Sequence, residues 1–242
     1  MQSRACARQL FIEHRKIPQC RGEPRIARIP CAPILQRILY RKRVVLDCIG
    51  FAARAMKIGP GSDPASDLTP VIRDSHRERI KEYIAIGQQE GAEVVLDGRE
   101  PGVEDGFFLG PTILDNVKGE MRVAREEIFG PVLSVVRVDS LPDAIEFTNQ
   151  SRFGNACSIY TESGSAARYF REHVQAGMVG VNVGVPAPMA FFPFNGMKHS
   201  FYGDLHATGK DGVRFFTENK VEVSRWYGDA TATRPSGYES GL

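Results

Sequence analysis

The stretch EEIFGPV, residues 126–132, places two adjacent carboxylates beside an aromatic ring and a Gly-Pro turn. In an extended segment alternate side chains share a side, so we expect Glu127 and Phe129 to point together, and Glu126 and Ile128 to point the other way. A buried carboxylate can accept hydrogen bonds from two neighbouring hydroxyls, as on a ribose, and a phenyl ring can pack against a flat ring. The alternative is an ordinary loop with a solvated Glu and a core Phe. On spacing alone, this alternative is preferred.

Cysteines and histidines offer weaker candidates for chemistry. Five cysteines, an odd number with irregular spacing and no CxxC pair, predict neither a disulfide framework nor a metal site. Cys157, in NACSIYT, is expected to be a buried core thiol. Cys31, in RIPCAPI, has only Arg28 nearby to lower its pKa, so we do not assign it as a nucleophile. His199 and His206 lie in glycine-rich loops and receive no catalytic role.

The elements that must position these residues alternate between strands and helices. DSHRERIKEYIAIGQQEGA predicts an amphipathic helix with Ile80, Tyr83, Ile84 and Gly87 on one face. PVLSVVRV is nearly all apolar, as in a strand covered on both faces. Further strands are expected at EVVLDG, ACSIYT and MVGVNV, and further helices at SLPDAIEFTNQS, ESGSAARYFREHVQAG and KDGVRFFTE. This alternation predicts an α/β fold, a parallel-sheet layer with helices.

The C-terminal segment KVEVSRWY predicts one more strand, in which apolar and polar residues alternate. Val221 and Val223 would lie on one face, and Glu222 and Ser224 on the other. A strand with one wet face is typical of a sheet edge, and such an edge readily pairs with another chain. The polar tail, residues 229–242, is expected to be flexible.

The first 50 residues differ in composition from the rest. They are rich in arginine and contain four of the five cysteines, whereas the net charge of the whole chain is only +2. Residues 32–46 could form a short basic helix running into a strand, and the arginine content resembles a mitochondrial transit peptide, although the stretch has a single serine. We expect a basic, poorly ordered head over residues 1–50. The charge balance does not predict a nucleic-acid partner, and no apolar run is long enough to cross a membrane.

Two longer blocks resemble the aldehyde dehydrogenase superfamily. The first, residues 106–161, contains EEIFGP, and the second, residues 177–226, contains NVGVPAP and PFNGMKHSFYGD. The second block is similar to the CoA-acylating methylmalonate-semialdehyde dehydrogenases. The resemblance covers the C-terminal part of such enzymes only, over about residues 52–228. It implies a partial catalytic domain over residues 51–218 and an oligomerisation strand over residues 219–228.

The resemblance implies NAD- and CoA-dependent oxidative decarboxylation of methylmalonate or malonate semialdehyde to propanoyl-CoA or acetyl-CoA. In that reaction a cysteine thiolate attacks the aldehyde, hydride passes to NAD, and CoA accepts the acyl group. Glu127 matches the carboxylate that holds the nicotinamide ribose, Phe129 the ring beside the nicotinamide, and Phe194 an aromatic residue of the substrate pocket. The intact family works as homo-oligomers, in the cytoplasm or the mitochondrial matrix.

Two parts of the family pattern are missing from this sequence. No Gly-Gln-Arg-Cys motif is present, and Cys31, at nearly the expected separation from Gly59, follows Pro30 where the family has arginine. No G-x-G-x-x-G motif follows a predicted strand. We therefore assign no catalytic residue and expect the chain alone to be inactive. A catalytically inactive assembly module that pairs with full-length subunits is the alternative.

Overall fold

The computed structural model describes residues 8–12, 35–39, 43–103 and 105–226. Its main feature is a seven-stranded sheet in the order β3-β4-β5-β2-β1-β7-β8, in which β3 is antiparallel to β4 and all other neighbours are parallel. The predicted α/β fold with a parallel sheet is thereby confirmed. The seven strands are β1 Arg8–Ile12, β2 Leu35–Leu39, β3 Glu93–Leu96, β4 Thr112–Asp115, β5 Val132–Val136, β7 Ala156–Tyr160 and β8 Met178–Val181.

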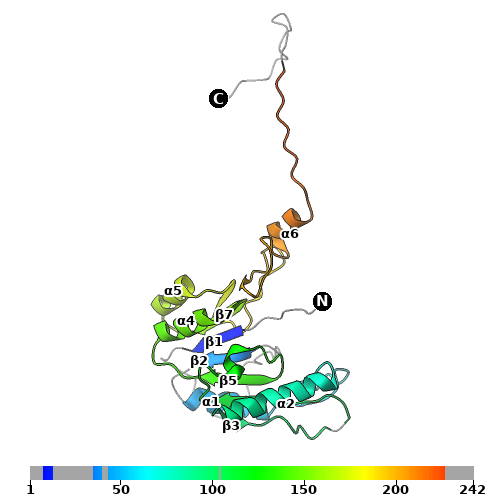
Figure 1. Ribbon diagram of the computed structural model, residues 1–242, viewed down its shortest axis with the longest axis vertical. Coiled ribbons are helices and arrows are strands. Elements are labelled where there is room, and N and C mark those ends of the chain that lie inside the picture. The colour runs from blue at the N-terminus through cyan, green and yellow to red at the C-terminus, as the bar shows by residue number, and fades with distance from the viewer. Residues whose placement is uncertain (1–7, 13–34, 40–42, 104, 227–242) are drawn as a thin grey trace, which may run out of the picture.

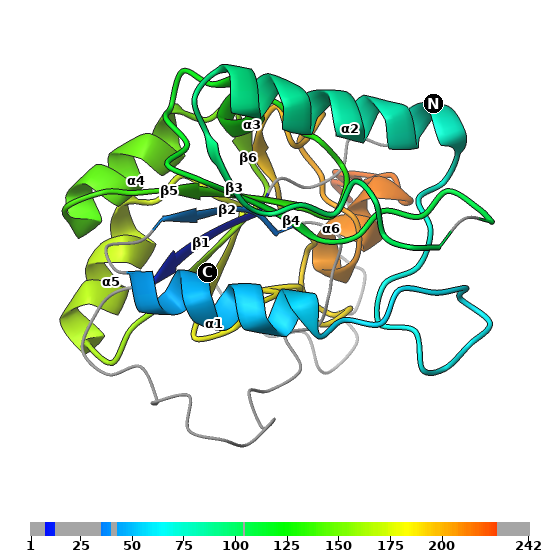
Figure 2. The ribbon, with the colours of Figure 1, turned by 90° about the horizontal axis from the view of Figure 1, so that it is seen from below.

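Helices cover both faces of this sheet (Figure 1). Seen from below, α2 lies along one face and α1 along the other (Figure 2). The helices are α1 Arg43–Arg54, α2 Asp74–Gln89, α3 Arg122–Arg125, α4 Leu141–Gln150, α5 Gly164–His173 and α6 Gly209–Phe215. A separate two-stranded ladder joins β6 Phe153–Gly154 to β9 Met197–Lys198.

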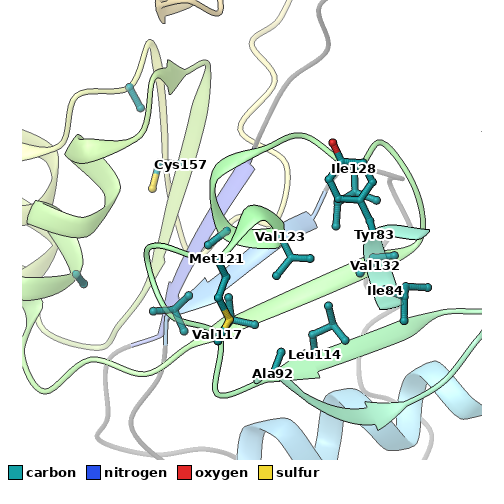
Figure 3. Close-up of a cluster of buried hydrophobic side chains, with 14 of the residues drawn as sticks. Tyr83, Ile84, Ala92, Leu114, Val117, Met121, Val123, Ile128, Val132 and Cys157 are labelled. Carbon is teal, nitrogen blue, oxygen red and sulfur yellow. The ribbon is translucent and has the colours of Figure 1, made fainter. Parts of the chain in front are cut away.

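The core divides into two clusters because side chains alternate across each strand. On β5, Val132 and Val136 belong to the larger cluster, whereas Val135 belongs to a smaller cluster with Leu46 of α1. The larger cluster packs β4, β5 and β7 against α2, α4 and α5 (Figure 3). The two-sided burial predicted for PVLSVVRV is confirmed.

The amphipathic face of α2 is also as predicted. Its buried residues are Ile80, Tyr83, Ile84 and Gly87, at the spacing that brings side chains to one side of a helix. Gly91, two residues beyond the end of α2, has a φ of 102°, a conformation that glycine adopts without steric penalty. This face therefore fixes the orientation of α2 above the sheet.

The prediction for residues 1–50 is wrong where the structure describes them. Strands β1 and β2 lie in the middle of the sheet, between β7 and β5, and α1 continues through the expected boundary at residue 50. In the stretch 32–46, the strand precedes the helix rather than following it. Parallel strands pair through backbone groups of distant segments, so the arginine-rich composition did not reveal them. Residues 1–7, 13–34 and 40–42 lie outside the described residues.

The C-terminal strand is not formed within the described part of the chain. Residues 217–226 have no regular secondary structure and extend away from the sheet (Figure 1). Val221, Val223 and Trp226 are 85–92% exposed. An extended segment becomes a strand only when its backbone groups find a neighbour, and none of the described residues supplies one. Residues 227–228 and the expected flexible tail, 229–242, lie outside the described residues.

In the part of the chain that the structure describes, no helix has both the length and the apolar character needed to cross a membrane.

Truncating one core side chain of α2 tests this packing. Ile84 is 1% exposed in the larger cluster, so Ile84→Ala should lower the free energy of unfolding by about 2–5 kcal/mol, because it leaves a cavity. Urea denaturation measures the change. Ile72→Ala is the matched control, since Ile72 is 83% exposed and its truncation should change stability by less than about 0.5 kcal/mol. Equal effects of the two substitutions would contradict the packing described here.

Candidate functional site

The loop that carries EEIFGP connects α3 to β5 and alternates between core and surface. Ile128 is 1% exposed and belongs to the same buried cluster as Tyr83 (Figure 3), whereas Phe129 is 41% exposed. Gly130 packs so closely on α2 that an added Cβ would lie 2.6 Å from Ile80 Cδ1. A larger residue there would require Ile80 or the loop to shift, so the absence of a side chain at Gly130 permits this close packing.

Glu126 is the anchored carboxylate of the pair. The Tyr83 hydroxyl donates to its Oε2 at 2.5 Å, and Arg122 donates to both of its oxygens at 3.1 Å. These donors stabilise the ionised form and hold the pKa of Glu126 below its ordinary value, Arg122 having the larger effect and Tyr83 the next. Glu126 is thus a paired carboxylate, and its orientation relative to Glu127 stays a prediction.

Glu127 is the carboxylate without such support. Among the described residues, its Oε1 is a buried oxygen that has no hydrogen-bond partner. Burial raises the pKa of Glu127 to about 7, and the nearby charge of Arg79 acts in the opposite direction. A buried polar oxygen without a partner is unfavourable, and donor groups of a ligand would relieve that cost. The orphaned oxygen therefore fits the two adjacent hydroxyls of a ribose.

Phe129 is held in an unusual backbone conformation. Its φ is 57°, in the left-handed region, which costs a residue other than glycine about 1–2 kcal/mol. Its carbonyl oxygen accepts a hydrogen bond from Nε2 of His76 at 2.7 Å, and the two rings are tilted with their centroids 6.0 Å apart. Phe129 is 41% exposed, in contrast to the buried Ile128 before it.

Phe194 comes from a different loop. It is 40% exposed, and its backbone amide donates to the carbonyl of Ala207 at 2.8 Å. The placement of its ring in a substrate pocket stays a prediction, as does the shared cleft for Glu127 and Phe129. A shallow hollow of about 420 Å³ lies between α4 and α5, lined in part by Pro142 and His173, and contains none of the three predicted residues.

The remaining sequence candidates have structural roles. Cys157 is 2% exposed, and burial raises the pKa of its thiol to about 12, which confirms a core thiol. Asn182, at the end of β8, accepts from the backbone amide of Thr161 at 2.9 Å and donates to its carbonyl at 3.0 Å, which links two loops. His206 has its Nε2 3.3 Å from the carbonyl oxygen of Gly196. Cys31 lies outside the described residues.

Sequence reasoning missed the side chains on α2 that contact this loop. Tyr83 was predicted only as a core residue, and no role was predicted for His76 or Arg79. A tyrosine on an otherwise apolar face was the available signal, because a buried phenol requires a hydrogen-bond partner. The identity of that partner, 43 residues away, had no local signal.

Comparison with known proteins bears directly on this loop. The sequence model of the Aldehyde dehydrogenase family matches residues 34–221. The chain belongs to the aldehyde dehydrogenase family. The match begins upstream of residue 52, where the motifs had placed the start of the resemblance, and it includes β2 and α1.

Relatives within the family carry names that agree with the resemblance. The chain is 57% identical over 176 residues to malonate-semialdehyde dehydrogenase of Halalkalibacterium halodurans, covering 72% of this chain and 36% of the relative. It is 53% identical over 176 residues to malonate-semialdehyde dehydrogenase 2 of Oceanobacillus iheyensis, with the same coverage. The chain thus spans about a third of the length of these curated relatives.

Solved structures in the family share the fold. The crystal structure of methylmalonate-semialdehyde dehydrogenase from Oceanimonas doudoroffii aligns with a TM-score of 0.82 and 35% identity, over 93% of this chain and 48% of that one. The Mycobacterium tuberculosis aldehyde dehydrogenase, crystallised with NAD+, aligns with a TM-score of 0.76 and 29% identity, over 92% and 47%. Both alignments extend well into the first 50 residues, as the positions of β1 and β2 require.

The burial of Glu127 has a measurable consequence for pH dependence. Its folded-state pKa of about 7 lies above the ordinary value of 4.5, so its contribution to stability is complete below pH 4.5 and is lost as pH rises through 7. Glu127→Gln should therefore flatten the decline in unfolding free energy across this interval. Carbon-13 NMR titration of the Glu127 carboxyl, with urea denaturation at pH 5 and pH 8, measures both effects.

Glu120→Gln is the control, since Glu120 is exposed and outside the loop. A Glu127 midpoint near 4.5 would show that the carboxyl is solvated rather than buried.

Proposed function

We propose that this chain supplies the nicotinamide-ribose side of the NAD site in a malonate- or methylmalonate-semialdehyde dehydrogenase. The observation that carries the proposal is the buried Oε1 of Glu127, which has no hydrogen-bond partner in the described part of the chain and which a vicinal diol can satisfy. Phe129 lies three residues after the anchored Glu126 and is partly exposed. Its ring would pack against the nicotinamide ring. Phe194 would line the pocket for the aldehyde.

The names of the relatives support the substrate class, and the NAD+ complex of a structural neighbour supports the cofactor. Bound NAD would supply the hydride acceptor, and CoA would be the acyl acceptor. The role of this chain's residues is to hold the ribose through Glu127 and to orient the attached ring through Phe129. The relatives reported above are bacterial, which supports the bacterial cytoplasm over the mitochondrial matrix as the compartment.

The chain by itself is proposed to be inactive. Its sequence contains no Gly-Gln-Arg-Cys motif, and Cys157 is a buried thiol with a raised pKa, unsuited to nucleophilic attack. One charge-assisted hydrogen bond contributes about 1.5–3 kcal/mol, against about 8 kcal/mol for micromolar affinity, so binding of NAD to this chain should be weak.

Weak binding is still measurable, and its geometry tests the proposal. Saturation-transfer NMR with millimolar NAD should show stronger transfer to the nicotinamide and its ribose than to the adenine. Above the Glu127 pKa of about 7, where the carboxylate is ionised, Glu127→Gln should weaken the interaction by about tenfold, because it replaces a charge-assisted acceptor with a neutral one. Phe129→Ala should reduce transfer to the nicotinamide protons specifically.

Glu120→Gln again serves as the control and should leave the transfer pattern unchanged. Transfer concentrated on the adenine, or an unaltered pattern in Glu127→Gln, would refute the assignment of the site. The same preparation, assayed with malonate semialdehyde, CoA and NAD, should form no NADH, and robust formation would refute the proposed inactivity.

A second candidate function is assembly with full-length subunits of the family. The observation that favours it is the C-terminal segment, in which Val221, Val223 and Trp226 are almost fully exposed, next to α6, which buries no residue. The backbone of this segment forms no ladder with the other described residues, and it would become the predicted strand by pairing with a full-length partner.

Co-purification tests this assembly role. A tagged full-length malonate-semialdehyde dehydrogenase should retain the chain, and Val223→Pro should abolish retention, because proline removes a backbone donor from the strand. Thr217→Pro, nearer to α6, is the comparison variant and should reduce retention less. A chain that stays strictly monomeric in light scattering, with or without the full-length subunit, would contradict this second function.

A further inference from the structure

One polar row on α2 faces the EEIF segment. His76, Arg79 and Tyr83 are spaced by three and four residues, which places their side chains along one side of the helix. Each contacts a different residue of the loop. They meet the loop in reverse order, so that the start of α2 contacts the end of the segment.

The contacts are specific at both ends. His76 donates from Nε2 to the carbonyl of Phe129 at 2.7 Å, and the Tyr83 hydroxyl donates to Glu126 Oε2 at 2.5 Å. Between them, Arg79 donates to the carbonyl of Glu127 at 3.4 Å. Since a carbonyl oxygen only accepts, the contact at Phe129 requires a proton on Nε2 of His76.

Two arginines lie close to the tyrosine ring. The guanidinium carbons of Arg79 and Arg122 lie 5.4 Å and 5.2 Å from the centre of the Tyr83 ring, within the range of cation–π attraction. Arg122 also binds Glu126, the acceptor of the Tyr83 hydroxyl. The Tyr83 ring and the Glu126 carboxylate therefore hold each other in one arrangement.

These contacts surround the two unfavourable features of the loop. Phe129 keeps a left-handed backbone, and Glu127 keeps a buried carboxyl oxygen for which the described residues supply no partner. Such features persist only where surrounding structure over-determines them. The contacts at residues 126 and 129 bracket both features, and Ile128 between them is fixed in the core.

We propose that His76 and Tyr83 are positioning residues that latch the two ends of the segment 126–129 onto α2, and thereby aim Glu127 and Phe129 at the cofactor. The inference rests on the proposed function for its purpose, but the latch is a property of the chain without ligand. It requires that release of either end moves Glu127 into water.

The test uses the whole chain without ligand and follows the Glu127 carboxyl by carbon-13 NMR titration. Tyr83→Phe removes one hydroxyl and should move the Glu127 midpoint from about 7 toward 4.5, because the freed loop becomes solvated. His76→Leu should have the same effect. His76→Gln should restore the wild-type midpoint, since its amide can donate to the same carbonyl. Amide exchange of residues 128–130 should accelerate in the first two variants only.

Tyr169→Phe is the matched control, because it removes a phenol oxygen from α5, away from the loop. The Glu126 midpoint should rise in Tyr83→Phe, which verifies that the hydrogen bond is lost. If it rises while the Glu127 midpoint and the amide exchange stay as in wild type, the latch is refuted. If His76→Gln and His76→Leu give the same Glu127 midpoint and the same amide exchange, His76 is not part of the latch.

The outcome separates the latch from the proposed function. If the Glu127 midpoint moves as expected but Glu127→Gln leaves NAD saturation transfer unaltered, the latch is correct and the cofactor assignment is wrong. If NAD transfer depends on Glu127 while Tyr83→Phe changes neither midpoint nor transfer, the cofactor assignment stands and the latch is wrong.

Discussion

The hydroxyl of Tyr83 is the point at which the apolar core meets the polar loop. Its ring packs in the larger buried cluster with Ile80 and Ile84, and its oxygen reaches Glu126 at the edge of that cluster. Glu126 is held by this hydrogen bond, and Ile128 is packed in the core. The backbone of Glu127, which lies between them, therefore has little conformational freedom. Glu127 is left with a buried oxygen that no described group satisfies. The properties of the candidate site follow from this one anchoring of a loop by a helix.

Two neighbouring carboxylates in this loop show opposite electrostatic behaviour for that reason. Glu126 lies among donors that stabilise its charge, whereas Glu127 is desolvated with only the charge of Arg79 to offset the loss. The pKa values of two glutamates one position apart are thus shifted in opposite directions by their surroundings. A carboxyl oxygen that is already desolvated in the free protein has little hydration left to lose when hydroxyl groups of a ligand bind to it.

Sequence patterns predicted the parts of the fold whose signals are local. The helix face of α2 and the two-sided burial of β5 follow from periodicities of 3.6 and 2, and both were correct. Strands β1 and β2 were missed because their place is set by pairing with β7 and β5, more than 90 residues away in sequence. In the candidate site, Glu127 and Phe129 came from a motif, whereas His76 and Tyr83 could not, because their partners lie 53 and 43 residues further along.

The exposed segment after α6 affects how this chain behaves at high concentration. Val221 and Val223 present exposed apolar side chains on a backbone that forms no ladder with the described residues, a combination that favours intermolecular β-aggregation. Lys220, Glu222 and Arg225 interrupt that apolar surface with charges of both signs, as gatekeeper residues do. Pairing of two copies of this segment would have to desolvate these charged side chains, and that cost opposes aggregation.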